Sequence, residues 1–490
     1  MAVSVLRPQR VRRAFRDFSA GLNTAADPAL LNDNESSDCQ SIRLDQKGTV
    51  EKFPGMTAQN ASLGAGGILG AHPFYRTDGY KCLLYKQGTT LYKYDSALGW
   101  NQVVKTGLAA GKRMRFCTYR DKAYCAEEGT APFTYDGTTL VDIGGLPPLS
   151  ALILDHKNHI FVVDPASPSK LIFSELDNPD SYPALNFIFV RGNDGDRITG
   201  FASEKSRLLV FKERTKWQIL GDSASNFALD GPRGRTGAVS QESIAVTDDL
   251  IYYCSRKGPA AWDLARSVDI GVKIPAQWKR VNPVAIAQTC ACAFDGKYYV
   301  AVPVDGSGSN NLCLVYDTLR MAWVPRAGWS LSSILSWAPA GIDLLYSGDS
   351  SAGLVYEHGG ATWNDNGVAI DAYWASKAWN FGFEERKTLK SIYLYLKLQI
   401  DPTNVDVEVD IDYSGWRKIA TLDLSKVVSL WDVAVWDRDV WDGDPEAKPF
   451  RVAIASKFRS IRVRVRNAEL NRTFRLYGVT FFFTVTPTAK

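Results

Sequence analysis

The sequence predicts an all-β fold: a β-propeller of six or seven blades, with an extended N-terminal arm and a C-terminal antiparallel β-sandwich. Short runs rich in Tyr, Phe, Val, Ile and Trp alternate with Gly, Asp, Asn and Pro through most of the 490 residues, which is typical of strands joined by turns. Sustained helical periodicity is hard to find. One strand-and-turn phrase also returns at a nearly regular spacing, which indicates a repeat architecture.

The repeated phrase is a strand that ends on an aromatic residue and an acidic or polar one. It occurs as LYKYD, PFTYD, LIFSE, TKWQ, PAAWD, LVYD and LVYE. The marker residues are Asp95, Asp136, Glu175, Gln218, Asp263, Asp317 and Glu357. They follow one another at intervals of about 40 to 55 residues, close to the length of a propeller blade. Such strand ends occur in any β protein, but their spacing favours a propeller over residues 60–362, and six blades plus an irregular element would fit almost as well as seven.

The two ends of the chain do not follow this repeat. After the linker ATWNDNG come longer strands, in TLKSIYLYLKLQI, NVDVEVDIDY, RSIRVRVRN and FRLYGVTFFFTV, which predict a β-sandwich over residues 363–490. Residues 1–59 are rich in Pro, Asp and Asn and fit neither pattern. We expect them to form an extended docking arm, ordered against a partner or against the rest of the chain.

Composition argues against several classes of protein. The net charge of +4, from 57 basic and 53 acidic residues, is too small to indicate nucleic-acid binding without local clustering. The charged start MAVSVLRPQRVRRAF does not fit a secretory signal, and no run of about 18 apolar residues predicts membrane insertion. We therefore expect a protein made in the cytosol, whose eight cysteines are reduced thiols in the core.

Residues that could carry catalysis are few, and we predict no catalytic residue, cofactor or metal ion. In DHKNH, His156 and His159 could share a metal with Asp155, but two strand-end histidines without a third soft ligand are usually structural. Paired carboxylates of a propeller hydrolase depend on three-dimensional spacing, so that alternative stays open. The acidic run VAVWDRDVWDGDPE does not match a calcium-binding EF-hand loop. We interpret it as an exposed loop in which Trp436 and Trp441 serve an interface, with an ion near Asp437 to Asp444 left open.

The most regular charge pattern is in RSIRVRVRN. Arg462, Arg464 and Arg466 alternate with aliphatic residues, which in a strand places all three guanidiniums on one face. In VDVEVDID, acidic residues alternate in the same way. One interpretation makes the arginine row a surface for DNA, a channel or a partner. The other, which we favour, makes the two segments neighbouring strands with cross-strand ion pairs.

The N-terminal RPQRVRRAFRDF differs from this row because few acids lie near it. Arg7, Arg10, Arg12, Arg13 and Arg16, together with Phe18, are the candidates for docking to a partner. A basic arm can contact phosphates or an acidic protein surface through charge alone. We favour a protein over DNA as the partner.

The order of these features resembles virion proteins of short-tailed bacteriophages, the tail nozzle or tail hub proteins. In those proteins a Phe-x-x-Gly-Leu segment, an Asp-Pro, an Asn-Glu pair and a closing Gly, Lys or Arg and Pro-Gly precede a propeller. The matching positions here are Phe18, Gly21, Leu22, Asp27, Pro28, Asn34, Glu35, Gly48, Lys52, Pro54 and Gly55. Two later stretches, DHKNHIFVVDPASPSKLIFSELDNPDSYP and WDGDPEAKPFRVAIASKFRSIRVRVRN, also look like that group.

The resemblance implies a structural virion protein without enzymatic activity. It would be assembled in the cytoplasm of a host bacterium and form a ring, typically of six copies, below the portal and adaptor. Double-stranded DNA would pass through the ring, and tail fibre proteins would be further partners. A channel of this kind should bind DNA weakly, so we expect a mixed or mildly acidic lining. The alternative is a receptor- or carbohydrate-binding propeller at the tail tip, with Trp436 and Trp441 as stacking platforms.

Overall fold

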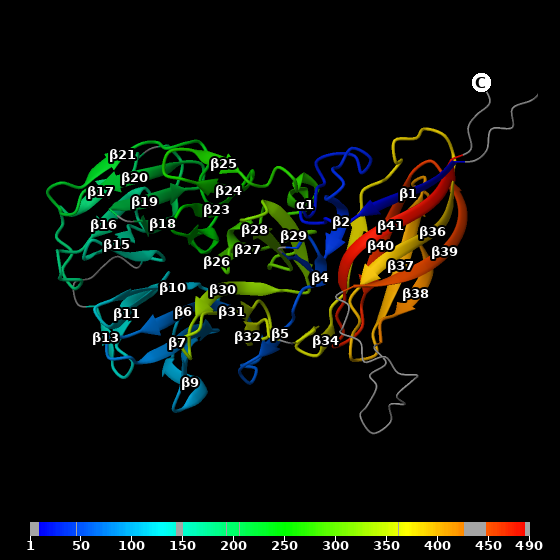
Figure 1. Cartoon of the computed structure of the whole chain (residues 1–490). Helices are drawn as coiled ribbons and strands as arrows, with labels where there is room; N and C mark the ends of the chain where they lie inside the picture. The colour runs from blue at the N-terminus through cyan, green and yellow to red at the C-terminus, as the bar shows by residue number, and fades with distance from the viewer. Residues whose placement is uncertain are drawn as a thin grey trace, which may run out of the picture.

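The computed structural model describes residues 9–45, 47–143, 150–192, 194–204, 206–360, 362–425 and 447–485. Over these ranges almost all of the regular secondary structure is β-strand (Figure 1). One short helix, α1 (Pro275–Lys279), and two 3-10 turns, η1 (Gln241–Ser243) and η2 (Ile286–Gln288), accompany the strands. The predicted all-β propeller with a β-sandwich is confirmed.

Seven sheets in the described ranges follow one another around the propeller (Figure 1). The first blade contains β6 (Ile68–Tyr75), β7 (Lys81–Gln87), β8 (Thr90–Asp95) and β9 (Gly99–Lys105). The second contains β10 (Met114–Tyr119), β11 (Lys122–Glu127), β12 (Thr130–Tyr135) and β13 (Leu140–Asp142). The third contains β14 (Ile153–His156), β15 (His159–Val163), β16 (Lys170–Phe173) and β17 (Phe187–Phe189). The fourth contains β18 (Ile198–Glu204), β19 (Arg207–Lys212), β20 (Lys216–Leu220) and β21 (Ala228–Asp230). The fifth contains β22 (Ala245–Val246), β23 (Ile251–Ser255), β24 (Gly258–Trp262) and β25 (Ser267–Asp269). The sixth contains β26 (Cys290–Phe294), β27 (Lys297–Val302), β28 (Leu312–Asp317) and β29 (Ala322–Ala327).

The repeated acids mark the third strand of each blade. Each marker lies in that strand or within about two residues of its end, and several of the aspartates shape the turn to the fourth strand. The Asp136 carboxylate accepts hydrogen bonds from the backbone N–H groups of Thr138 and Thr139, at 2.9 and 2.7 Å. Asp263 does the same for Ala265 and Arg266, at 2.9 and 2.7 Å. The repeat therefore reflects, in part, one kind of turn that is used in several blades.

The seventh blade is completed by the N-terminal part of the chain. Its strands β30 (Leu331–Trp337), β31 (Leu344–Asp349) and β32 (Val355–His358) pair in order, and β5 (Met56–Ala58) is the fourth strand. The short strands β33 (Asn364–Asp365) and β34 (Val368–Ala369) extend the same sheet. Closing the ring with a distant strand joins the last blade to the start of the chain and covers an exposed edge.

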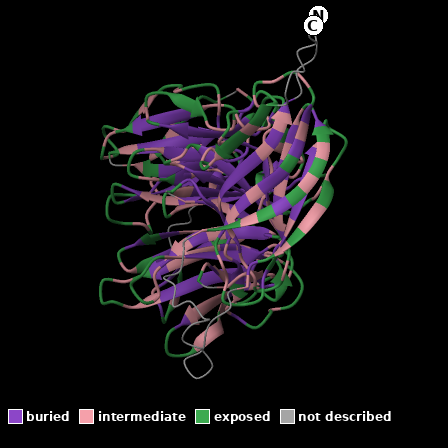
Figure 2. Cartoon of the chain, turned by 45° about the vertical axis from the view of Figure 1, so that its right-hand side comes forward, coloured by how far each residue is buried: buried purple, intermediate pink, exposed green. Residues whose placement is uncertain are grey.

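The sandwich has two sheets, which lie at the right-hand end of the molecule in Figure 1. The outer sheet contains β1 (Gln9–Phe15), β3 (Ile42–Leu44), β4 (Val50–Lys52), β36 (Lys387–Leu396), β39 (Lys448–Phe458) and β41 (Arg475–Val485). The inner sheet contains β2 (Ser36–Gln40), β35 (Ala372–Ser376), β37 (Asn404–Ile411), β38 (Arg417–Asp423) and β40 (Ile461–Asn467). Aliphatic and aromatic residues of both sheets face each other, so buried and exposed positions alternate along the strands (Figure 2).

The predicted domain limits need two corrections. Residues 1–59 are not a separate arm, since β1 to β4 belong to the sandwich and β5 belongs to the seventh blade. The predicted start of the sandwich at residue 363 is also too early, because β33 and β34 still belong to that blade. Pairing with strands hundreds of residues away satisfies the backbone groups of these early segments, which a local sequence pattern does not reveal.

Candidate functional site

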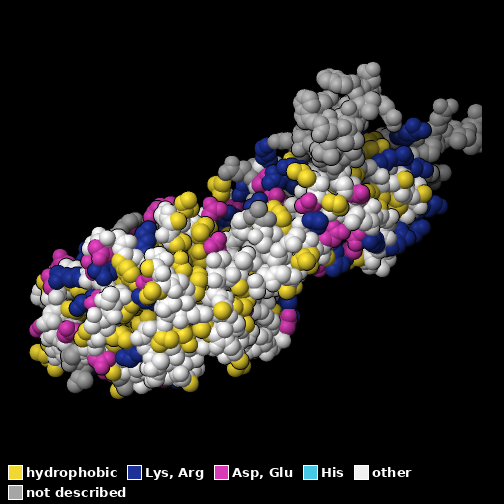
Figure 3. Space-filling model, turned by 90° about the horizontal axis from the view of Figure 1, so that it is seen from below, with side chains coloured by type: hydrophobic (Ala, Val, Ile, Leu, Met, Phe, Trp, Pro, Cys, Tyr) yellow, Lys and Arg dark blue, Asp and Glu magenta, His cyan; other side chains and the backbone are white. Residues whose placement is uncertain are grey.

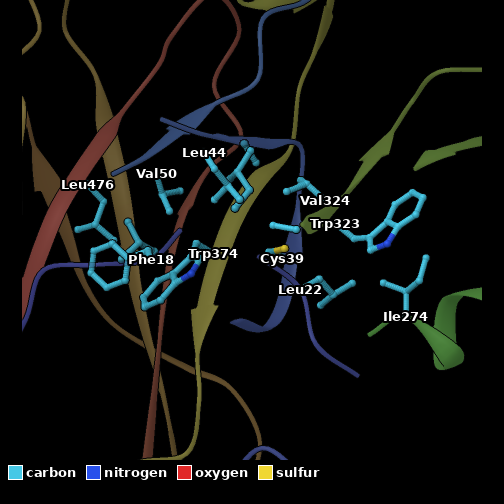
Figure 4. Packing of buried hydrophobic residues seen from close by; sticks show 14 of the residues in the cluster. Phe18, Leu22, Cys39, Leu44, Val50, Ile274, Trp323, Val324, Trp374 and Leu476 are labelled. Carbon is cyan, nitrogen blue, oxygen red and sulfur yellow. The ribbon is translucent and has the colours of Figure 1, made fainter. Parts of the chain in front are cut away.

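The junction between propeller and sandwich is built by the segment that carries the tail-protein resemblance. Phe18 and Leu22 are both 0% exposed, and the Phe18 ring lies 4.5 Å from that of Trp374 in the inner sheet. The same apolar cluster continues through Trp323 of β29 into the sixth blade (Figure 4). Propeller and sandwich therefore share one core.

Two glycines of the junction allow backbones to come close. Gly21 has φ +64, and a Cβ there would lie 2.7 Å from the backbone oxygen of Trp323. The next residue, Leu22, donates its N–H to that oxygen at 2.9 Å. A Cβ on Gly55 would lie 1.7 Å from the backbone oxygen of Asn364, where β5 meets β33. A side chain at either position would force these segments apart.

Charged groups are buried beside these contacts. The Lys52 Nζ donates to Asn467 Oδ1 at 2.9 Å and to the Glu469 carbonyl at 3.1 Å, and the whole residue is 0% exposed. Burial and, after it, the nearby Arg326 lower the pKa of Lys52 to about 8. Arg326 is itself 0% exposed and pairs with Asp365 at 2.6 Å. Buried groups with fixed partners specify one arrangement of the junction.

The centre of the propeller is a small cavity of about 350 Å³, lined by the inner strands of several blades. Arg115 of β10 donates to Glu242 Oε1 at 2.7 Å and Oε2 at 3.2 Å, and to the Ala151 carbonyl at 2.7 Å. Arg113, directly before β10, donates to the Ser332 carbonyl at 2.6 Å. Two arginines of one blade thus cross the axis and tie several blades together.

This cavity holds Glu242 in its ionised form. Burial raises the pKa of the Glu242 carboxyl, but Arg115 and Arg113 outweigh burial and hold that pKa below its ordinary value. None of these three residues was predicted from the sequence as part of a site. The alternation of Arg113 and Arg115 in RMRFC was a visible signal, whereas the approach of Glu242 depends on closure of the ring.

The arginine row of β40 is paired within the inner sheet. Arg462, Arg464 and Arg466 lie opposite Asp410, Glu408 and Asp406 of β37 in the strand register. Arg462 pairs with Asp410 and Arg464 with Glu408, while Arg466 donates to Asp371 at 2.7 and 2.9 Å. The cross-strand interpretation therefore describes this row, and its role in an interface or channel stays a prediction.

The N-terminal candidates have different positions. Phe18 is buried in its own chain, so its assignment to partner docking is wrong. Arg10, Arg12 and Arg13 lie in β1 and Arg16 directly follows it, and all four are exposed. Arg7, Trp436, Trp441 and the acidic residues Asp437 to Asp444 lie outside the described residues.

The histidines of DHKNH have separate partners. His156 Nδ1 lies 2.8 Å from Ser203 Oγ, and His159 Nδ1 lies 2.7 Å from the Ser174 carbonyl. Within the described ranges, no three His, Cys, Asp or Glu side chains gather as a metal site would require. Nor does any helix there have the length and apolar character needed to cross a bilayer. All eight cysteines are free thiols.

Comparison with known proteins gives similarity of fold alone. No family model and no curated protein matches the sequence. Similar solved structures include "YCF48 bound to D1 peptide", at 11% identity over 66% of this chain and 97% of that chain, with a TM-score of 0.40. "Streptogramin B lyase structure" has 10% identity, coverage of 62% and 97%, and a TM-score of 0.42. The Pan2 WD40 domain of Neurospora crassa has 9% identity, coverage of 65% and 98%, and a TM-score of 0.40. One of these is an enzyme by its name.

Proposed function

We propose that this chain is a structural protein of a bacteriophage tail, which forms a ring around the path of the DNA below the portal and adaptor. The proposal is supported by the place in the structure of the residues that carry the tail-protein resemblance. Phe18, Gly21 and Leu22 build the junction that fixes the sandwich on the propeller, and Lys52 and Gly55 flank the step from β4 of the sandwich to β5 of the seventh blade. A rigid two-part body suits a wall component whose copies must contact one another in a fixed geometry.

In this proposal the DNA passes between copies and not through a single propeller. The central cavity of about 350 Å³ is crossed by the hydrogen bonds of Arg113 and Arg115 and is far too narrow for a duplex. A channel therefore needs several copies arranged around an axis, with tail fibre and adaptor proteins as further neighbours. The proposed location is the tail of the virion.

The proposal includes the absence of enzymatic activity. The central cavity of the propeller contains a carboxylate, Glu242, whose pKa is held low by two arginines. A general acid needs the opposite shift, since its pKa must lie near the working pH. The Glu242 carboxylate is instead a structural partner of Arg115.

The test is incorporation into particles. Phage particles that carry an epitope tag on this chain would be purified, analysed by mass spectrometry and imaged by electron microscopy with a labelled antibody. We expect several copies per particle and label at one vertex, on the tail axis. Particles that form normally and infect without the chain would overturn the proposal. Purified protein that binds a glycan array would favour the receptor-binding alternative.

A further inference from the structure

The outer sheet of the sandwich presents a basic face without acids. Four of its six strands, β1, β36, β39 and β41, contain no Asp or Glu. The basic face is formed by the exposed residues Arg10, Arg12, Arg16, Lys390, Arg451 and Lys457. None of these six makes an ion pair with a described residue, in contrast to the paired row of the inner sheet.

The strand register places Arg10, Arg451 and Lys457 on one side of the sheet. One row across the four strands runs from Arg10 of β1 through Thr484 of β41 and Thr388 of β36 to Lys457 of β39. In the same way, the row through Tyr393 ends at Arg451. Directly opposed residues point to the same side of a sheet, so the charges occupy both edges of one face. Figure 3 shows Lys and Arg side chains gathered at the sandwich end of the molecule.

Aromatic rings occupy the middle of the basic face. The rings of Tyr393 and Phe482 lie 5.2 Å apart, and the Arg12 guanidinium lies 5.8 Å from the Phe482 ring. The Arg16 guanidinium lies 3.7 Å from the ring of Tyr395. A surface of guanidiniums and aromatic rings suits an occupant that carries both carboxylates and aromatic side chains.

The sequence of this chain contains such an occupant. Residues 431–446, WDVAVWDRDVWDGDPE, lie outside the described residues and combine three tryptophans with six acids and a single arginine. The acids are Asp432, Asp437, Asp439, Asp442, Asp444 and Glu446. A basic face and a separate acidic segment in one chain favour a head-to-tail contact between copies, which closes into a ring when the rotation between copies allows it.

We propose that the basic face binds residues 431–446 of a neighbouring copy. This contact would join neighbouring copies in the ring of the proposed function. It rests on the charge pattern of the two surfaces, so it can be tested whether or not the chain belongs to a tail. Double-stranded DNA, the other polyanion that a basic face could bind, is an outcome of the test.

The first experiment measures binding of a labelled synthetic peptide of residues 431–446 by fluorescence anisotropy. The protein is the full chain with its own six acids of that segment changed to the corresponding amides, which leaves the face free. We expect the peptide to bind the variant R10E/R12E/R451E about tenfold or more weakly than the parent protein. Binding to the parent protein should weaken by a similar factor as the salt concentration rises from about 50 to about 500 mM. The matched control R235E/K257E/R266E changes the same charge at exposed residues of the propeller and should bind normally.

The second experiment distinguishes a contact between copies from one within a copy. The variants R10E/R12E/R451E and D437K/D439K/D442K should each fail to associate alone, and should associate when mixed in equal amounts, as measured by sedimentation velocity. Three results would overturn the proposal: equal peptide binding by the face variant, no recovery on mixing while the unmodified chain associates, or displacement of the peptide by equimolar duplex DNA. Circular dichroism of every variant confirms that it is folded.

Discussion

The guanidinium of Arg16 lies 3.7 Å from the ring centroid of Tyr395, although β41 lies between β1 and β36. Gly478 of β41 makes this possible. A Cβ there would lie 2.6 Å from Arg16 Cδ and 3.0 Å from the Phe15 carbonyl. The missing side chain leaves space for the arginine to cross one strand and stack on the next.

Replacing Gly478 with Val should therefore destabilise the protein by about 1–3 kcal/mol through overpacking. Chemical denaturation measures the change in the free energy of unfolding. Because the side chain of Arg16 supplies the nearest contact, R16A/G478V should be less destabilised than the sum of the two single variants. Additive effects would show that the Phe15 backbone, and not Arg16, limits the space.

Gly55 should tolerate substitution least, because its hypothetical Cβ meets backbone and not a flexible side chain. We expect G55A to lower the free energy of unfolding by about 3 kcal/mol or more, since β5 and β33 would have to separate. The control is G308A, where a Cβ meets nothing within 4 Å. Equal stability of the two variants in a denaturation experiment would contradict this account of the seventh blade.

The two sets of arginines in the sandwich should differ in their contribution to stability. The side chain of Asp410 is 1% exposed and that of its partner Arg462 is 19% exposed, so R462A leaves a buried carboxylate without its cation. We expect a loss of about 2–4 kcal/mol. R12A removes an exposed charge with no ion-pair partner among described residues and should cost about 0.5 kcal/mol or less. Similar losses in both variants would argue against this difference.

Acid should destabilise the seventh blade through His358. This residue is 8% exposed, its Nε2 lies 2.6 Å from Ser347 Oγ, and burial together with Arg326 lowers its pKa to about 3. The unfolded chain takes up a proton on His358 near pH 6.5, whereas the folded chain does so only near pH 3. This residue therefore leaves the free energy of unfolding unchanged above pH 6.5 and lowers it as the pH falls from there towards 3.

Between pH 7 and pH 5 this effect should remove about 2 kcal/mol from the wild-type free energy of unfolding. The variant H358Q lacks the titrating group, so its stability should fall by that much less over the same interval. Urea denaturation at the two pH values measures the difference. Equal falls for the two proteins would mean that His358 is already protonated, or accessible, in the folded state.

The parts of the fold that were predictable depend on local chemistry. Asp136 and Asp263 mark their turns because the carboxylate bonds to backbone only two and three residues away. The ion pairs of β40 were predictable because both partner strands alternate charge and apolar residues.

The parts that were missed depend on contacts between distant segments. Nothing in QRVRRAF indicates pairing with residues 479–485, and nothing near Glu242 indicates that Arg115 approaches it. The acid-free face became visible only when the register placed β1 beside β41 and β36 beside β39. The sequence indicated the basic residues of β1, but only the register showed that Lys390, Arg451 and Lys457 belong to neighbouring strands of the same acid-free sheet region.

The pairing of β1 with β41 joins the first described strand to the last. During translation at about 5–20 residues per second, the earliest segment waits roughly 25 to 100 s before its partner leaves the ribosome. The blades between them can form in that interval, but neither the sandwich nor the seventh blade can be completed in order of synthesis. A nascent chain released early would thus carry open strand edges at both ends, and a chain that extends through β41 is the first species able to cover them.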